Sequence, residues 1–258
     1  MRFVPFVVIL TALVAAVASP AWAITNGSLD GVDHPEVGAL IADKPLGDGT
    51  WSYCTGTLIS PTVFLTAAHC GERGQKTARV SFSSHYGPGD AVYTGRYVPD
   101  ERYDDKADPY DMAVVVFDAA VPGIKPATLP AEGMLDRLKA DGSLETARFT
   151  PVGYGAQAPT KSRHGWKFTY TDTRNQASIS FESLSRGWLK LSVNPFKGDG
   201  GTCYGDSGGP NFLGGPASDV LVATTISGDD DACKATNYDY RLDTPAARHF
   251  LGRFVTLP

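Results

Sequence analysis

Short apolar segments separated by glycine and proline run through the whole chain, and they constrain its fold more than any other feature. The 258 residues include 28 glycines and 18 prolines. The segments between them are rich in Val, Ile, Thr, Tyr and Phe, the residue types that favour strands. Those predicted as strands are 37–42, 57–59, 113–117, 148–152, 187–193 and 220–226, with 168–184 as a longer strand or a hairpin. Strands at this spacing, with no long helix between them, predict antiparallel barrels or a sandwich.

Helices are predicted in only two places. Thr244 is a good N-cap, and Pro245 suits the first position of a C-terminal helix. The apolar face of that helix would hold Ala246, Ala247, Phe250, Leu251 and Phe254. A shorter helix is predicted at 134–140. The Pro- and Gly-containing stretch 119–130 is the predicted connection between two halves.

The first 23 residues have the pattern of a signal peptide. Arg2 precedes the apolar run 3–17, and Ala-Trp-Ala at 21–23 places small residues at the two positions that a signal peptidase reads. The apolar run is shorter than the ~20 residues of a membrane span. We therefore expect cleavage before Ile24 and export of residues 24–258 to the periplasm or the extracellular space, with a retained membrane anchor as the alternative.

Charge and cysteine content narrow the class further. The formal net charge of −5 and the lack of a basic run argue against nucleic acid or a membrane surface as partner. In an exported chain, four cysteines predict two disulfides, and counting leaves three connectivities open. Without a Cys-x-x-Cys pair or a calcium loop, we expect no metal and no cofactor. The remaining histidines, expected at the surface, are His34, His85, His164 and His249.

Three separated motifs supply the parts needed for acyl transfer. Residues 205–210 read Gly-Asp-Ser-Gly-Gly-Pro, residues 66–70 read Thr-Ala-Ala-His-Cys, and an acid precedes the apolar run 112–116. Ser207 would attack a carbonyl carbon, His69 would take and return the proton, and Asp111 would hold the imidazole tautomer. The flanking glycines would leave the amides of Gly205 and Ser207 free to bind the oxyanion.

Together, these motifs resemble the chymotrypsin-like (trypsin-fold) serine endopeptidases, and their order His, Asp, Ser agrees with that family. Further similarity lies in Cys-Thr-Gly-Thr-Leu-Ile at 54–59 and Gly-Tyr-Gly at 153–155. The resemblance implies an all-β fold of two antiparallel six-stranded barrels with a short C-terminal helix. The first barrel would span about 24–130 and the second about 131–258.

The resemblance also implies two disulfides and an activation pair. Cys54–Cys70 would clamp the loop that carries His69, and Cys203–Cys233 would brace the substrate pocket. Members of the family fold an aliphatic N-terminal residue inward, so its ammonium pairs with the aspartate before the nucleophile. That pair would be the α-amino group of Ile24 with Asp206, and export itself would generate the active form.

The implied substrate pocket departs from that of strict trypsins. Where they carry an aspartate at the pocket floor, this chain has Gly201, and Thr202 follows. The other walls are expected from Thr225, Ile226, Ser227 and Tyr238. A strict preference for Lys or Arg is therefore not expected, and small or apolar residues are favoured before the cut. The acidic run 229–231 reads as a solvated loop; alternatively it, or Asp239, attracts basic substrates from the rim.

Taken together, the sequence predicts a secreted, monomeric serine endopeptidase that acts on polypeptides. Two alternatives remain open at this stage. One is a binding protein without activity, in which Tyr204 or Tyr238 blocks the pocket. The other is an enzyme that hydrolyses esters only, because esters undergo the same acyl chemistry.

Overall fold

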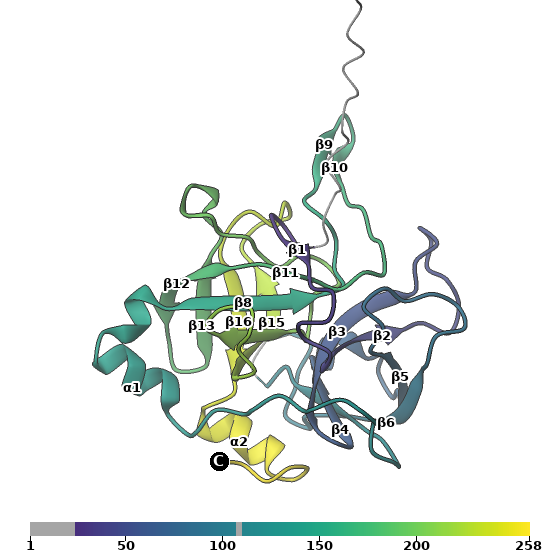
Figure 1. Cartoon of the computed structure of the whole chain (residues 1–258), viewed down its shortest axis with the longest axis horizontal. Helices are drawn as coiled ribbons and strands as arrows, with labels where there is room; N and C mark the ends of the chain where they lie inside the picture. Colours follow the sequence, from purple (N-terminus) through teal and green to yellow (C-terminus); the bar gives the residue numbers. More distant parts are fainter. Residues whose placement is uncertain (1–23, 107–109) are drawn as a thin grey trace, which may run out of the picture.

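The computed structural model describes residues 24–106 and 110–258. It contains two closed six-stranded antiparallel barrels, which lie side by side in Figure 1. The expectations for 1–23 fall outside the described residues. None of the helices in the described ranges is long and apolar enough to cross a membrane.

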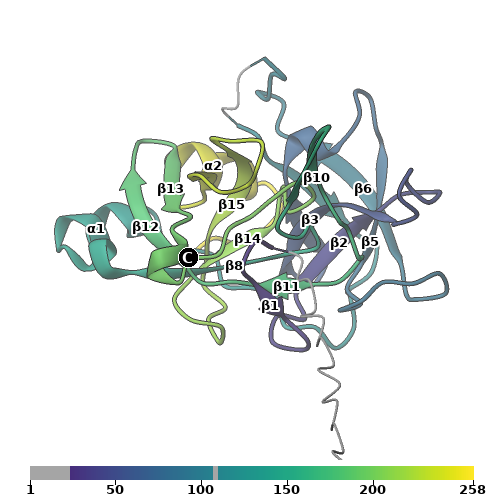
Figure 2. The same cartoon turned by 90° about the horizontal axis from the view of Figure 1, so that it is seen from above.

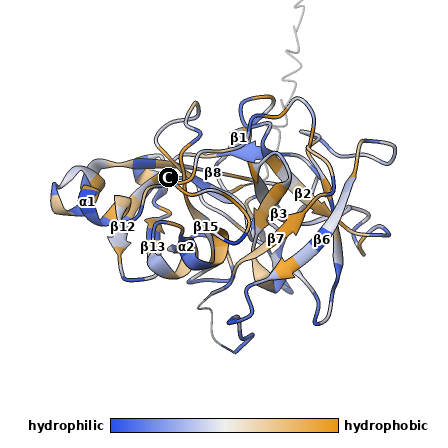
Figure 3. Cartoon of the chain, turned by 90° about the horizontal axis from the view of Figure 1, so that it is seen from below, coloured by the Kyte–Doolittle hydropathy of each residue, from blue (hydrophilic) through white to orange (hydrophobic). Residues whose placement is uncertain are grey.

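The first barrel closes in the order β2-β3-β4-β7-β6-β5. Its strands are β2 (Val37–Ile41), β3 (Ser52–Ser60), β4 (Val63–Thr66), β5 (Thr77–Ser81), β6 (Tyr93–Pro99) and β7 (Ala113–Val116). Figure 3 shows apolar residues concentrated in β2, β3 and β7. Leu40, Leu58, Phe64 and Val115 are among the side chains of the cluster buried in this barrel, so its stability comes from closing a sheet around them.

The second barrel closes because β8 pairs with β14 as well as with β12. Its strands are β8 (Arg148–Gly153), β12 (Ile179–Leu184), β13 (Trp188–Ser192), β14 (Pro210–Leu213), β15 (Leu221–Gly228) and β16 (Asn237–Arg241). Phe149, Ile179, Leu189 and Val222 lie in its core. The two expected barrels are thus confirmed.

Smaller elements extend the second barrel. The two-residue strands β1 (Ser28–Leu29) and β11 (Asn175–Gln176) lengthen its sheet beside β8, so the start of the described chain lies against this barrel. A two-stranded hairpin of β9 (Thr160–Ser162) and β10 (Gly165–Lys167) projects away from both barrels in Figure 1. In the view from above, the same hairpin overlaps the ribbon near β3 (Figure 2).

Both expected helices are present. α1 spans Met134–Ala140, and α2 spans Pro245–Leu251. The Thr244 hydroxyl accepts a hydrogen bond from the Ala247 amide at 3.2 Å, which caps α2 as its sequence predicts. Phe254 lies beyond the end of α2 but still packs edge-to-face on Phe250. Three short 3-10 turns complete the regular elements of the described chain: η1 (Ala68–Cys70), η2 (Ser143–Thr146) and η3 (Pro195–Lys197).

Two expectations from the sequence are corrected. The segment 168–184 is not one long strand or a single hairpin, because it is divided between β11 and β12. His34 is not at the surface, since only 1% of it is exposed. Its ring stacks on Phe212 with 4.9 Å between ring centroids. Alternation of polar and apolar residues does not show where a short irregular segment interrupts a strand. Nor does the sequence show that the ring of His34 is buried beside a hydrogen-bonding partner.

The partners of His34 form a buried charge network. His34 Nδ1 lies 2.5 Å from Asp30 Oδ1, and Arg174 Nε donates to Asp30 Oδ2 at 2.6 Å. The Arg174 guanidinium also donates to the carbonyls of Gly31, Val37 and Phe82 at 2.9–3.2 Å. Although burial opposes ionisation of Asp30, the hydrogen bond with His34 and the charge of Arg174 hold its pKa below the usual value. Arg174 therefore joins the N-terminal segment to the first barrel.

Candidate active site

Strand pairing brings the histidine and aspartate motifs together. β4 and β7 are antiparallel neighbours, with Thr66 opposite Ala113. The chain leaving β4 and the chain entering β7 therefore meet at the same end of the barrel. His69 lies in η1 just after β4, and Asp111 lies just before β7. Register alone thus places the two side chains within reach of each other.

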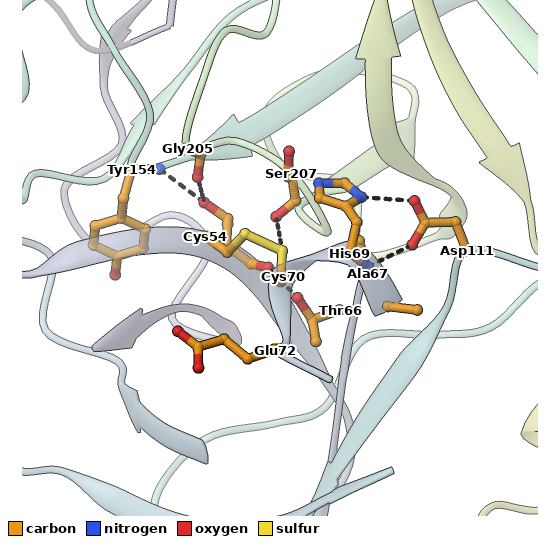
Figure 4. Close-up of a disulfide and its surroundings, with 12 residues drawn as sticks. Cys54, Thr66, Ala67, His69, Cys70, Glu72, Asp111, Tyr154, Gly205 and Ser207 are labelled. Carbon is orange, nitrogen blue, oxygen red and sulfur yellow. Dashed lines mark hydrogen bonds and ion pairs between the residues drawn. A yellow bond between two sulfur atoms is a disulfide. The ribbon is translucent and has the colours of Figure 1, made fainter. Parts of the chain in front are cut away.

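Two hydrogen bonds join His69 to Asp111, and both are drawn in Figure 4. The His69 amide donates to Asp111 Oδ1 at 2.9 Å, and His69 Nδ1 lies 2.6 Å from Asp111 Oδ2. The Asp111 side chain is 2% exposed and that of His69 is 32% exposed. A buried carboxylate as acceptor requires the proton to sit on Nδ1 of the neutral ring. His69 Nε2 is consequently left as the basic nitrogen.

Ser207 lies in the turn that leads into β14, beside His69 (Figure 4). Both residues line one pocket of about 280 Å³. The turn needs glycine at two places: φ is +95° at Gly205 and +80° at Gly208, in the left-handed region. A Cβ at Gly205 would also come within 2.9 Å of the Gly155 Cα. The glycines of the motif are thus required by the backbone itself.

Thr55 on β3 holds this turn in place by donating hydrogen bonds to two carbonyl groups of the turn. Its amide donates to the Ser207 carbonyl and its hydroxyl donates to the Gly205 carbonyl, each at 2.9 Å. Within the described residues, the amides of Gly205 and Ser207 donate to no protein acceptor. Two backbone donors are therefore left free beside the serine. Thr55 was not singled out from the sequence, although it lies within the 54–59 motif.

Two disulfides tie the site to its surroundings. Cys54–Cys70 joins β3 to the turn that carries His69. Cys203–Cys233 joins the turn that carries Ser207 to the loop after β15. These are the two pairs that the resemblance implies. Each disulfide restricts the unfolded chain and is worth ~2–4 kcal/mol.

Asp206 is completely buried beneath the turn. Its carboxylate accepts hydrogen bonds from the Gly155 and Cys203 amides, each at 2.8 Å. Burial outweighs these bonds and raises the pKa of Asp206 to about 7. Ile24 is also completely buried, and Thr25 exchanges two backbone hydrogen bonds with Gly201, at 2.9 and 3.0 Å.

The pocket lining differs in part from the expectation. Thr202, Thr225, Ile226 and Ser227 line it as expected, and Asn237, Asp230 and Asp231 join them. Gly201 is not among the lining residues and lies behind the pocket wall. A Cβ added to Gly201 would come within 2.5 Å of the Val193 side chain. Tyr238 is turned away, because on β16 the alternate residue Asn237 faces Thr202.

Tyr238 instead contacts the outside of the second barrel, so it is not a wall of the pocket. Its hydroxyl is 2.9 Å from Lys190 Nζ, and its ring packs edge-to-face on Trp188. Asp239 likewise lies away from the rim. It is completely buried beside Asn211, whose side-chain amide donates to it at 2.8 Å. Burial raises the pKa of Asp239 to about 8, above the value of an exposed aspartate.

The two barrels, with His69 and Ser207 lining one pocket and Asp111 hydrogen-bonded to His69, match the architecture of chymotrypsin-like serine endopeptidases. The family model for trypsin matches residues 44–250, and the chain belongs to the trypsin family of serine endopeptidases.

Individual relatives agree with this assignment. A trypsin of Saccharopolyspora erythraea is 30% identical over 211 residues, which cover 76% of this chain and 82% of the relative. Trypsin 5G1 of Aedes aegypti is 27% identical over 175 residues, 64% of this chain, and the matched part spans 62% of that relative, less than two thirds of its length. Among solved structures, HL collagenase superposes with a TM-score of 0.67 at 19% identity, over 89% of this chain and 97% of the other, which supports the fold alone.

Proposed function

We propose that this chain is exported and hydrolyses peptide bonds through an acyl-enzyme on Ser207, with His69 and Asp111 as its catalytic partners. The observation that carries the proposal is the 2.6 Å contact of His69 Nδ1 with the buried Asp111 carboxylate. It leaves His69 Nε2 free to act as a base on the side of the pocket that holds Ser207. The substrate is a polypeptide, as in the rest of the family.

In the first step, Ser207 Oγ forms a bond to the substrate carbonyl carbon while its proton passes to His69 Nε2. The carbonyl oxygen becomes an oxyanion and is stabilised by the amides of Gly205 and Ser207. Asp111 stabilises the imidazolium. The carbon–nitrogen bond then breaks, and the amine leaves with the proton from His69. Water, deprotonated by His69, next attacks the ester carbon; the Ser207 Oγ–carbon bond breaks, the acid leaves, and His69 returns the proton to Ser207 Oγ.

The direct test is hydrolysis of a peptide library by chain 24–258 and by its Ser207→Ala variant. We expect cleavage by the parent and none above background by the variant. Parallel turnover of an ester distinguishes a peptidase from an enzyme limited to esters. A folded parent that cleaves neither substrate would refute the proposal and favour a binding protein.

The pocket, we propose, does not enforce a strict preference for Lys or Arg. Thr202, Thr225 and Asn237 line it without charge. Asp230 and Asp231 supply the negative charge of its lining. Their attraction acts partly through solvent, so it adds preference for basic side chains without requiring them.

The Asp231→Asn variant should lower the ratio of kcat/KM for Arg over Leu substrates by about threefold at low ionic strength. Added salt should reduce the difference between parent and variant, because it screens exposed charges. Asp229→Asn is the matched control, because Asp229 is not among the lining residues. Equal ratios in parent and Asp231→Asn at low salt would show that the acidic lining plays no part in selection.

Removal of residues 1–23 is proposed to activate the enzyme. In the uncut chain, the Asp206 carboxylate accepts hydrogen bonds from the backbone amides of Gly155 and Cys203. Among the described residues, none of its partners is a cation. Ile24 has a φ of +67°, which is strained for a β-branched residue. A cut before Ile24 would relieve that strain and create an ammonium group. Pairing of this ammonium with Asp206 would hold the turn that presents the Gly205 and Ser207 amides.

A chain that starts one residue earlier, at position 23, should therefore have kcat/KM about 100-fold or more below that of 24–258. Its stability should also respond differently to pH. A folded-state pKa of about 7 for Asp206 means that the folded form binds the proton more tightly than the unfolded one. The free energy of unfolding should then fall by up to about 1 kcal/mol per pH unit between pH 4 and 7.

Chain 24–258 should lose less stability over the same range, because the ammonium favours the ionised carboxylate. Asp239 contributes equally to both chains, so their difference reports Asp206. Asp206→Asn in the longer chain should remove the extra slope. Full activity of the longer chain, or equal slopes in urea titrations, would contradict an activating pair of Ile24 and Asp206.

A further inference from the structure

The carboxylate partner of His69 lies in a tight turn with an unfavourable backbone conformation. Tyr110, directly before Asp111, has a φ of +65°, in the left-handed region that aromatic residues rarely adopt. The Met112 amide donates to the Tyr110 carbonyl at 2.7 Å, so Asp111 is the middle residue of a three-residue turn. A strained conformation of this kind persists only where neighbouring groups hold it. The groups around Tyr110 therefore decide where the Asp111 carboxylate points.

The end of β6 restrains one side of this turn. The Asp100 amide donates to the Met112 carbonyl at 2.8 Å, which continues the antiparallel pairing of β6 with β7. Met112 follows Asp111, so this contact fixes the chain after the carboxylate. It does not fix Tyr110, which lies before the carboxylate.

Arg102 restrains the other side of the turn. Its Cζ lies 4.2 Å from the centroid of the Tyr110 ring, which is a cation–π contact. The guanidinium is held there by Asp100, whose carboxylate accepts from Arg102 Nε at 2.9 Å and from Nη2 at 2.6 Å. Nη2 also donates to the Ala246 carbonyl of α2 at 3.0 Å. One planar group thus joins the end of β6, the turn of Asp111 and the C-terminal helix.

The pair of Arg102 and Asp100 is well suited to hold a ring in place. The Asp100 side chain is 1% exposed and that of Arg102 is 32% exposed, so the carboxylate is shielded from solvent. The hydrogen bond with Asp100 raises the pKa of Arg102, so the cation over the ring keeps its charge. Two parallel bonds to one carboxylate also fix the orientation of the guanidinium plane.

We propose that Arg102 is a positioning residue for the reaction: by packing on Tyr110, it keeps the Asp111 carboxylate aimed at the histidine. Arg102 is not among the residues that line the pocket, so it acts through Asp111 and not on the substrate. The inference rests on the proposed function, because it concerns the 2.6 Å contact that leaves His69 Nε2 basic.

Steady-state kinetics of chain 24–258 give the first test. Arg102→Gln keeps a polar side chain but places no charge over the ring, and it should lower kcat by about tenfold. KM should stay within about twofold, because Asp111 stabilises the imidazolium only as the proton moves. Arg102→Lys should recover part of kcat, since it keeps the cation but not the planar, two-bond pair.

Arg79→Gln is the matched control. The Arg79 side chain is 31% exposed, and it also donates to a carboxylate and to a backbone carbonyl, those of Asp43 and Ala42. Arg79 is not among the residues that line the pocket with Ser207. Its replacement should change neither kcat nor KM by more than about twofold.

Two further measurements separate positioning from a purely structural role. The Nδ1 proton of His69, 2.6 Å from a carboxylate oxygen, should give a low-field resonance in the proton NMR spectrum of the parent. This resonance should shift upfield or broaden in Arg102→Gln and stay in place in Arg79→Gln. In the Asp111→Asn background, Arg102→Gln should change kcat by less than about twofold, because the carboxylate that it positions is already absent.

Tyr110→Leu keeps the test decisive if the loss of Arg102 prevents folding. This variant removes the ring but leaves the buried Asp100 carboxylate with its cation. It should therefore reproduce both the shifted resonance and the roughly tenfold loss of kcat. Urea unfolding shows which variants are folded under the assay conditions.

Either an unchanged resonance or a parental kcat, in folded Arg102→Gln or in Tyr110→Leu, would overturn the inference. An equal loss of kcat in the Asp111→Asn background would overturn it too, since Arg102 would then act on something other than the carboxylate. The resonance reports on the hydrogen bond whether or not the enzyme turns over. A parent that gives the resonance but hydrolyses nothing would refute the proposed function, and the shift in Arg102→Gln would still decide this inference.

Discussion

Replacing His69 with alanine is expected to lower kcat by about 10⁴-fold or more, with KM within about a factor of three. Without the imidazole, the Ser207 hydroxyl keeps its proton and is a poor nucleophile near neutral pH. KM should change little because His69 lines the pocket beside Ser207, and the walls formed by Thr202, Thr225 and Asn237 remain in the variant. Steady-state hydrolysis of the best library peptide measures both constants.

Asp111→Asn should cost about as much, because an amide no longer requires the proton to sit on His69 Nδ1. His85→Ala is the control, since His85 is exposed, its Nδ1 contacts the Thr173 hydroxyl, and it is not among the residues that line the pocket. It should leave kcat within about twofold. A loss of less than about tenfold in His69→Ala would mean that another base activates Ser207.

Replacing Arg174 with methionine should lower the free energy of unfolding by about 3–5 kcal/mol. Methionine fills a similar volume but donates no hydrogen bond. Asp30 would then stay buried without its cation, and the carbonyls of Val37 and Gly31 would lose a donor. Urea unfolding of chain 24–258 measures the change, and catalytic constants of the folded fraction should be nearly unaffected.

The matched control is Arg186→Met, since Arg186 is exposed. It should change the free energy of unfolding by less than about 0.5 kcal/mol. Asp30→Asn in the Arg174→Met background should recover part of the loss, because the unpaired charge disappears. A loss below about 1 kcal/mol in Arg174→Met would show that the network contributes little to stability.

Much of the fold and the motif residues could be predicted from the sequence because their signals are local. Strands 37–42, 113–117 and 148–152 have compact β-rich patterns, and the observed strands match them within one residue at each end. The C-terminal helix begins at Pro245, as its capping residue indicates. Each of the three motifs can be recognised from its own residues. The family resemblance then predicts that the three motifs lie close together in space.

The pocket was less predictable because it depends on strand parity. An error of one residue on β16 exchanges Asn237 for Tyr238, and side chains on neighbouring positions point to opposite faces. The buried pair of Asp30 and Arg174 could not be found either. The two residues lie 144 positions apart in the sequence, so no local sequence pattern indicates that they are in contact. Thr55 was missed for a similar reason, since its role depends on a turn from the other barrel.

The measurement that tests the central claim most directly is the mass of the acylated protein. Chain 24–258 is mixed with an activated ester at low pH, where deacylation is slow because protonated His69 cannot activate water. We expect the mass to rise by one acyl group, located by peptide mapping on Ser207, and to return to its starting value when the pH is raised. The Ser207→Ala variant should show no increase. Turnover of the ester without an adduct on Ser207, or an equal adduct in the variant, would contradict covalent catalysis by this serine.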